Sequence, residues 1–301
     1  MPILSYIFKR RLFEQPLQKD EVIQLPIAQL NGASLYYETQ GNGTAIFFIH
    51  GRGWTHRMFK PQLDYFSKHY QVIVCDLRGN GQSGKLRQSP DEIIDTQCLD
   101  LIMLMNMLHI RDAVFVGISY GGLIVQQIAA QYPERVRAIV IADSFCRSGD
   151  STIAGKLQLA AAYLSCLADY APPQLLFPSL RLMYQRWDLA YSELRRNLLD
   201  KRPRELYRQR LATSRIDYSA QLASFDRPAL CVVGDYSEYS FACMREVVSH
   251  LSHGRLDVIP DAVDPSNLCQ PDAFNAIVQQ FLEDEVMVER SLTPSREVAN
   301  E

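Results

Sequence analysis

A series of short, uninterrupted apolar runs limits most strongly how this 301-residue chain can fold. Five such runs are separated by longer polar or amphipathic segments, at residues 45–49, 71–75, 113–116, 138–141 and 229–233. A strand that is apolar at every position is covered on both faces, as the central strands of a parallel sheet are. Residues 90–109 and 121–131 have the length and pattern of helices that connect such strands. This alternation predicts a mostly parallel, twisted sheet with helices packed on its faces.

A hairpin is expected before the first buried run. Residues 22–29 and 34–38 have the character of short strands, and Asn31-Gly32 between them is a strong signal for a tight turn. A further strand is expected near the end of the chain, at residues 255–259. The first two of these strands should therefore form a hairpin, and the sheet as a whole should be mostly parallel.

The alternation of strands and helices stops between residues 141 and 229, where the sequence is helical in character and rich in Tyr, Leu and Arg. We interpret residues 144–226 as a helical cap that is inserted into one core. The core would consist of residues 22–143 and 227–283. The remaining segments are a basic amphipathic extension at residues 1–21 and a polar tail at 284–301.

The composition excludes several classes of partner. A net charge of −3 gives no general attraction to nucleic acid, and no apolar stretch reaches the length of about 20 residues that spans a membrane. The seven cysteines are scattered without a CxxC pair, which argues for reduced thiols and against a zinc site. The beginning of the sequence lacks the pattern of a signal peptide. We therefore expect a cytoplasmic protein with no metal and no cofactor, and the sequence leaves its oligomeric state open.

A potential nucleophile lies between a predicted strand and a predicted helix. Residues 117–121 read GISYG and directly follow the apolar run 113–116. The G-x-S-x-G pattern in this context forms a sharp turn, a nucleophile elbow, that lifts the Ser119 hydroxyl above the sheet. The N-terminus of the following helix favours negative charge near that hydroxyl.

Two further segments complete a resemblance to the α/β-hydrolase fold family. Residues 49–53 (IHGRG) resemble its oxyanion loop, and residues 76–83 (DLRGNGQS) resemble its D-x-R-G-x-G-x-S turn. With the elbow and the cap, the resemblance extends over about residues 22–283. It implies an α/β-hydrolase fold whose oxyanion hole is formed by the backbone N–H groups of Arg52 and Tyr120, with His50 bracing the loop.

The same resemblance implies where the two partners of Ser119 should lie. The acid normally lies three residues after the glycine that ends the strand at 229–233, and that position holds Ser237. The histidine normally ends an I-P-x-A-x-H segment, but here residues 259–264 read IPDAVD and the position holds Asp264. We predict a degenerate catalytic triad, in which the serine is kept and both partners are replaced.

Several other side chains could support the chemistry of Ser119 and Asp264. Burial should raise the pKa of Asp264, and Asp235 and Glu238 are expected to add to this effect. His56 begins a helix on the productive side and could face the pocket mouth. The Arg52 side chain could bind an anionic substrate group, pair with Asp264, or contact the cap or solvent. A metal site made of Asp264, Glu238 and His56 is disfavoured.

Asp143, directly after the run 138–141, is an alternative position for the acid. Without a histidine it has no imidazole to orient, so the sequence assigns it no role.

Three functions are compatible with these residues. The first is an enzyme that acts on a small lipophilic carbonyl compound by elimination, cyclisation or decarboxylation, with Ser119, Asp264 and the oxyanion hole. The second is a weak, esterase-like serine hydrolase, and the third is a non-catalytic pseudoenzyme that binds a ligand or partner. We favour the first, because an Asp with a pKa of ~3.9 is about 3.5 kcal/mol less basic than a His with ~6.5. The expected ligand carries a carbonyl or carboxylate group.

Overall fold

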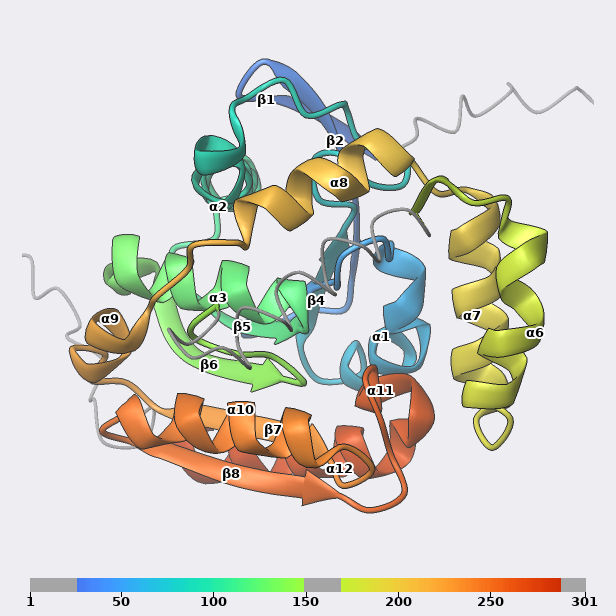
Figure 1. Cartoon of the computed structure of the whole chain (residues 1–301). Coiled ribbons are helices and arrows are strands. Elements are labelled where there is room, and N and C mark those ends of the chain that lie inside the picture. The colour runs from blue at the N-terminus through green and yellow to red at the C-terminus, as the bar shows by residue number, and fades with distance from the viewer. Residues whose placement is uncertain (1–25, 149–168, 288–301) are drawn as a thin grey trace, which may run out of the picture.

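An eight-stranded sheet runs through the centre of the protein in the order β1-β2-β4-β3-β5-β6-β7-β8 (Figure 1). The computed structural model describes residues 26–148 and 169–287. The strands are β1 (Ile27–Leu30), β2 (Ala33–Gln40), β3 (Ala45–Ile49), β4 (Gln71–Cys75), β5 (Ala113–Ile118), β6 (Val136–Ala142), β7 (Ala229–Gly234) and β8 (Gly254–Ile259). The six strands from β4 to β8 in this order pair with their neighbours in parallel. Strands β1 and β2 form the antiparallel edge. The predicted fold class is confirmed.

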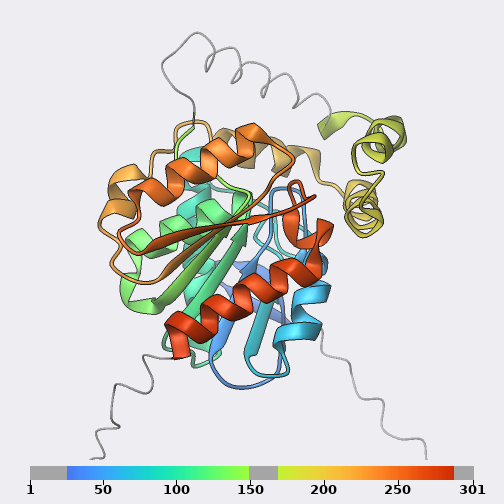
Figure 2. The ribbon, with the colours of Figure 1, turned by 90° about the horizontal axis from the view of Figure 1, so that it is seen from below.

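Helices cover both faces of the sheet (Figure 2). They are α1 (Lys60–Phe66), α2 (Ile93–Met107), α3 (Tyr120–Gln131), α10 (Glu238–His250), α11 (Ser266–Cys269) and α12 (Pro271–Phe281), with short helical turns η1 (His56–Phe59), η2 (Pro90–Glu92), η3 (Pro133–Arg135) and η4 (Leu282–Met287). Successive residues of a strand point to opposite faces. Phe47 accordingly packs with α2, α3 and α10, whereas Phe48 packs with α1 and α12. Each central strand is therefore apolar throughout.

The predicted helix over residues 90–109 divides in two and ends early. Pro90 begins η2, and α2 then continues to Met107. His109 has a φ of 56°, and the Ile110 N–H donates to the carbonyl oxygen of Met105 at 2.9 Å. This left-handed residue turns the chain out of the helix and toward β5.

The described part of the segment interpreted as a cap, residues 169–226, contributes no strand to the sheet. It contains α6 (Pro173–Met183), α7 (Asp188–Leu199), α8 (Pro203–Ala212) and α9 (Ser219–Ala223). Helix α7 packs against α11, with α6 on the outer side of α7, and α8 packs against η2 and α2 (Figure 1). Residues 1–25, 149–168 and 288–301, and with them parts of the predicted extension, hairpin, cap and tail, lie outside the described residues. Within the described ranges no helix is long and apolar enough to cross a membrane.

A buried ion pair fixes the D-x-R-G-x-G-x-S turn against the rest of the core. The Arg78 guanidinium donates to both carboxylate oxygens of Asp100 in α2, at 2.8 and 2.6 Å, and both side chains are 3 % exposed. Asn31 in the β1–β2 turn donates to the same carboxylate at 3.0 Å. The turn, the hairpin and α2 are thus held by one polar cluster.

Removing one partner should leave the other charge buried and unpaired. We expect Asp100→Ala to lower the free energy of unfolding by about 3–5 kcal/mol, measured by urea denaturation. The matched control is Asp112→Ala, which breaks the half-exposed Arg137–Asp112 pair and should cost no more than about 1 kcal/mol. Equal losses from the two variants would contradict a stabilising role for the buried cluster.

Candidate active site

Ser119 occupies a strained turn between β5 and α3. Its φ of 54° and ψ of −113° lie outside the regions that a serine normally adopts. The glycines on either side make the turn possible: a Cβ on Gly117 would lie 2.3 Å from the Gly121 carbonyl oxygen, and one on Gly121 would lie 2.0 Å from that of Ile49. The strain, of order 1–3 kcal/mol, is sustained by this close packing.

The loop before η1 is braced by His50, which is fully buried. The Leu77 N–H donates to His50 Nε2 at 2.9 Å, so the ring proton resides on Nδ1, which donates to the Gly51 carbonyl oxygen at 2.7 Å. Burial lowers the pKa of this imidazole, which keeps it neutral. This arrangement agrees with the structural role expected for His50.

One predicted oxyanion donor, Tyr120, belongs to the elbow, and the other, Arg52, belongs to the loop before η1. Tyr120 is the first residue of α3, so its backbone N–H has no acceptor within the helix and adds to the positive end of the helix dipole. The Tyr120 side chain is buried and donates to Gln97 Oε1 at 2.7 Å. Arg52 lies in the braced loop, and its role with Tyr120 as an oxyanion hole stays a prediction.

The structure brings Asp264 to Ser119. Asp264 lies in the loop after β8, and its carboxyl group is near enough to the Ser119 hydroxyl for that hydroxyl to favour the ionised carboxylate. The cap positions this loop: the Tyr184 hydroxyl donates to the Asp264 carbonyl oxygen at 2.6 Å, and Trp187 Nε1 donates to that of Asp261 at 2.9 Å. The side chain that stands where the resemblance places a histidine therefore lies beside Ser119.

A second carboxylate, Asp143, lies beside Asp264. It follows β6 with a φ of 50°, and it accepts the N–H of Ser266 at 2.7 Å and that of Gly234 at 3.3 Å. Burial raises the pKa of Asp143, but these N–H donors favour its ionised form. Burial, and next the charge of Asp143, raise the pKa of Asp264 to about 8. Asp264 is therefore the member of the pair that holds a proton at neutral pH.

The sequence alone assigns Asp143 no role. Its position nevertheless indicates a possible functional residue, because it directly follows a buried strand, at the edge of the sheet where parallel strands place functional groups. The sequence could not show that Asp264, which follows a different strand, lies beside Asp143.

The expectation that Asp235 and Glu238 raise the pKa of Asp264 is wrong. Both side chains are exposed, and the neighbouring charge that acts on Asp264 is that of Asp143. Ser237 caps α10, where its hydroxyl accepts the Ser240 N–H at 3.2 Å. Only three residues separate β7 from α10, so residues 235–238 form the connection to the helix and its first turn.

The structure also contradicts a supporting role for His56 at the pocket mouth. Its Nδ1 lies 2.7 Å from Asp76 Oδ1, and its Nε2 lies 3.3 Å from Glu38 Oε1. The ring also packs on Tyr36 at a centroid distance of 4.7 Å. With both nitrogens engaged by carboxylates, His56 ties η1 to the antiparallel edge of the sheet and has no nitrogen left for Ser119.

The Arg52 side chain contacts the cap, which was one of the alternatives for it. Its Nη1 lies 3.0 Å from Asp169 Oδ2, and the two side chains are 26 % and 15 % exposed. This half-buried ion pair connects the loop before η1 to the described beginning of the cap.

Comparisons with known proteins agree with this architecture. Residues 44–251 match the sequence profile of the alpha/beta hydrolase fold family. The chain belongs to this family. It is 28% identical over 270 residues to 3-oxoadipate enol-lactonase 2 of Acinetobacter baylyi, a match that covers 83% of this chain and 93% of that protein. It is 26% identical over 269 residues to the (E)-2-((N-methylformamido)methylene)succinate hydrolase of the same organism, over 84% of this chain and 95% of the relative.

Solved structures of this family share the fold. The enol-lactonase from Burkholderia xenovorans LB400 superposes with a TM-score of 0.75 at 24% identity, covering 86% of this chain and 100% of that chain. A hydrolase from Pseudomonas aeruginosa PA01 gives a TM-score of 0.74 at 25% identity, covering 87% and 99%. The arrangement of strands that brings Ser119 and Asp264 together is thus that of the alpha/beta hydrolase fold.

The proton on Asp264 predicts how stability depends on pH. The pKa of this carboxyl group is about 8 in the folded protein and ~3.9 in an unfolded chain, so between these values only the folded state holds the proton. Its contribution to stability is complete below pH ~4 and is lost as the pH rises through about 8, by at most ~1.4 kcal/mol per pH unit.

Asp264→Asn removes this titration, since the amide is neutral at every pH. We expect the free energy of unfolding of the variant, relative to wild type, to increase steadily from pH 5 to pH 8 in urea denaturation. Asp235→Asn, at an exposed position, is the matched control and should show no such trend. A constant difference between Asp264→Asn and wild type over this range would contradict the raised pKa.

Proposed function

We propose that this protein is an enzyme that acts on a small lipophilic carbonyl compound, and that Asp264 works in it as a general acid and base. The observation that carries the proposal is the buried carboxyl group of Asp264, which lies beside the Ser119 hydroxyl and the Asp143 carboxylate. A group that already holds a proton at neutral pH is a poor acceptor for the proton of a serine hydroxyl. The same group is well suited to deliver a proton, since its pKa lies near the working pH.

The reactions that fit are those that pass through an enolate or a similar oxyanion. The substrate carbonyl oxygen would lie against the N–H groups of Arg52 and Tyr120, where negative charge on that oxygen is stabilised. In a decarboxylation, the bond to the carboxylate carbon breaks, CO₂ leaves, and the resulting enolate carbon takes the proton from Asp264. Water then returns a proton to the carboxylate. Elimination and cyclisation need the same two elements, an oxyanion site and one group that moves a proton.

The named relatives support a small substrate with carbonyl and carboxylate groups. An enol-lactonase and a succinate-derivative hydrolase act at such groups, and both match this chain over more than four fifths of its length. Their names also favour the second candidate, a weak hydrolase with Ser119 as nucleophile, because the strained elbow is retained here. The two candidates differ in whether Ser119 is needed for proton transfer to carbon.

Exchange of α-hydrogens with solvent distinguishes these candidates. We expect the wild-type protein to accelerate the exchange of small ketones and 3-oxo acids in D₂O, followed by NMR, above the buffer rate. Asp264→Asn should lose this acceleration by at least ~100-fold, the usual contribution of a positioned acid or base. Ser119→Ala should retain most of it. Exchange that depends on Ser119 and not on Asp264 would contradict the proposal and favour the hydrolase.

Asp264→His should restore hydrolase chemistry. An imidazole at this position would lie between Ser119 and the carboxylate of Asp143, so a base and an acid to orient it would both be present. We expect hydrolysis of p-nitrophenyl acetate to rise ~100-fold over wild type. The same change combined with Asp143→Asn should give little of that gain. A wild-type protein that hydrolyses the ester as fast as the Asp264→His variant would contradict the loss of the triad.

A further inference from the structure

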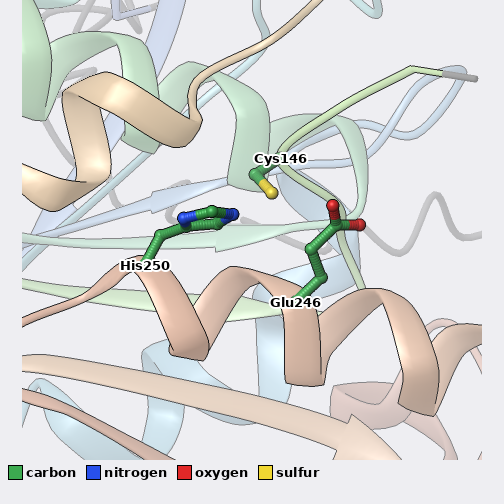
Figure 3. Close-up of side chains that lie close together, drawn as sticks. All are labelled: Cys146, Glu246 and His250. Atoms are coloured by element: carbon green, nitrogen blue, oxygen red, sulfur yellow. The ribbon is translucent and has the colours of Figure 1, made fainter. Parts of the chain in front are cut away.

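Away from the active site, three side chains with different metal-binding atoms converge at the base of the cap. Figure 3 shows the Cys146 thiol, the Glu246 carboxylate and the His250 imidazole pointing toward one another. Their ligand atoms all lie within 4.8 Å of one another, and Cys146 is buried while the other two are half-buried. In the sequence Cys146 lies far from the other two, so no short motif indicates the cluster.

Two structural elements create this convergence. Glu246 and His250 are four residues apart near the end of α10, so they lie on the same face of the helix, one turn from each other. Cys146 comes from the segment after β6, which packs on α10: the Ser144 N–H donates to Met244 Sδ at 3.2 Å. The three groups are therefore fixed by the packing of α10 against the sheet.

We infer that Cys146, Glu246 and His250 form a binding site for Zn²⁺ or a similar divalent transition-metal ion. Thiolate, imidazole and carboxylate are the ligands that zinc takes in proteins, whereas Mg²⁺ and Ca²⁺ prefer oxygen ligands alone. Three protein ligands leave a fourth tetrahedral position, and the half-buried side of the cluster gives water access to it. On binding, the thiol proton passes to solvent.

The distances allow such a site with small side-chain movements. Three atoms 4.8 Å apart surround a centre about 2.8 Å from each, whereas zinc lies ~2.0–2.3 Å from its ligands. Side-chain rotations that move each ligand atom by at most about 0.5–0.8 Å close this gap. Arg147 Nη2 lies 2.6 Å from Glu246 Oε1, so it can orient the carboxylate in the way that outer partners orient metal ligands, with the other oxygen facing the ion.

The position of the cluster suggests what the ion would do. Cys146 lies where the chain leaves the core for the cap, and its carbonyl oxygen accepts the N–H of Tyr218, where the chain returns. The Ser148 N–H likewise donates to the Ile216 carbonyl oxygen at 2.9 Å. An ion held by Cys146 and α10 would fasten both connections of the cap to the core.

Metal titration of the full-length, chelator-treated protein tests this inference. We expect wild type to bind one equivalent of Co²⁺ with a thiolate-to-cobalt charge-transfer absorption, and one equivalent of Zn²⁺. At ~100 times the Kd, Zn²⁺ should raise the Tm by about 5 °C. Cys146→Ser should abolish the charge-transfer band, and His250→Gln should weaken the affinity at least ~10-fold.

Matched controls come from the same part of the fold. Cys243 lies half-buried on α10 outside the cluster, and His253 is exposed just after this helix. Cys243→Ser and His253→Gln should bind both ions as wild type does. Because His250 is half-buried, His250→Gln should fold even if Cys146→Ser does not. The inference is overturned if wild type binds neither ion, if His250→Gln and folded Cys146→Ser bind as wild type does, or if either control abolishes binding.

Discussion

The parallel register of β5 to β8 is the constraint on which the active site depends, because it brings four strand ends to one edge of the sheet. Ser119 follows β5, Asp143 follows β6, Gly234 ends β7 and Asp264 lies after β8. The N–H of Gly234 holds the Asp143 carboxylate in place, and Asp143 in turn lies beside Asp264. The site is therefore assembled from four segments that are distant in the sequence, and the order of the strands in the sheet places them side by side.

In this arrangement, burial and the charge of Asp143 together determine how tightly Asp264 holds its proton. Two buried carboxyl groups side by side cannot both ionise readily, and the backbone donors around Asp143 stabilise its charge in preference to that of Asp264. In a triad the residue next to the serine accepts its proton. In the function proposed here that residue already holds a proton, so it delivers the proton to the substrate and does not activate the serine.

The sequence predicted the parts of this site that depend on the backbone. Continuous apolar runs located the strands, and the glycines around Ser119 and the frame around Asp264 located two residues that the fold then brings together. What it could not predict depends on where side chains meet. The His56 ring contacts two carboxylates near the antiparallel edge of the sheet. Asp235 is exposed to solvent, and the charge that acts on Asp264 is that of Asp143. Such pairings join segments that no local pattern connects.

The protonation of Asp264 at neutral pH is the central claim, and difference infrared spectroscopy tests it most directly. A protonated carboxyl group has a C=O stretching band that ionised carboxylates lack. The wild-type protein at pH 7 should show such a band, lost in Asp264→Asn, and it should disappear on titration with a midpoint of about 8. A wild-type spectrum in which the band attributable to Asp264 is already absent at pH 7, with a midpoint near the ordinary value of ~3.9, would contradict the account.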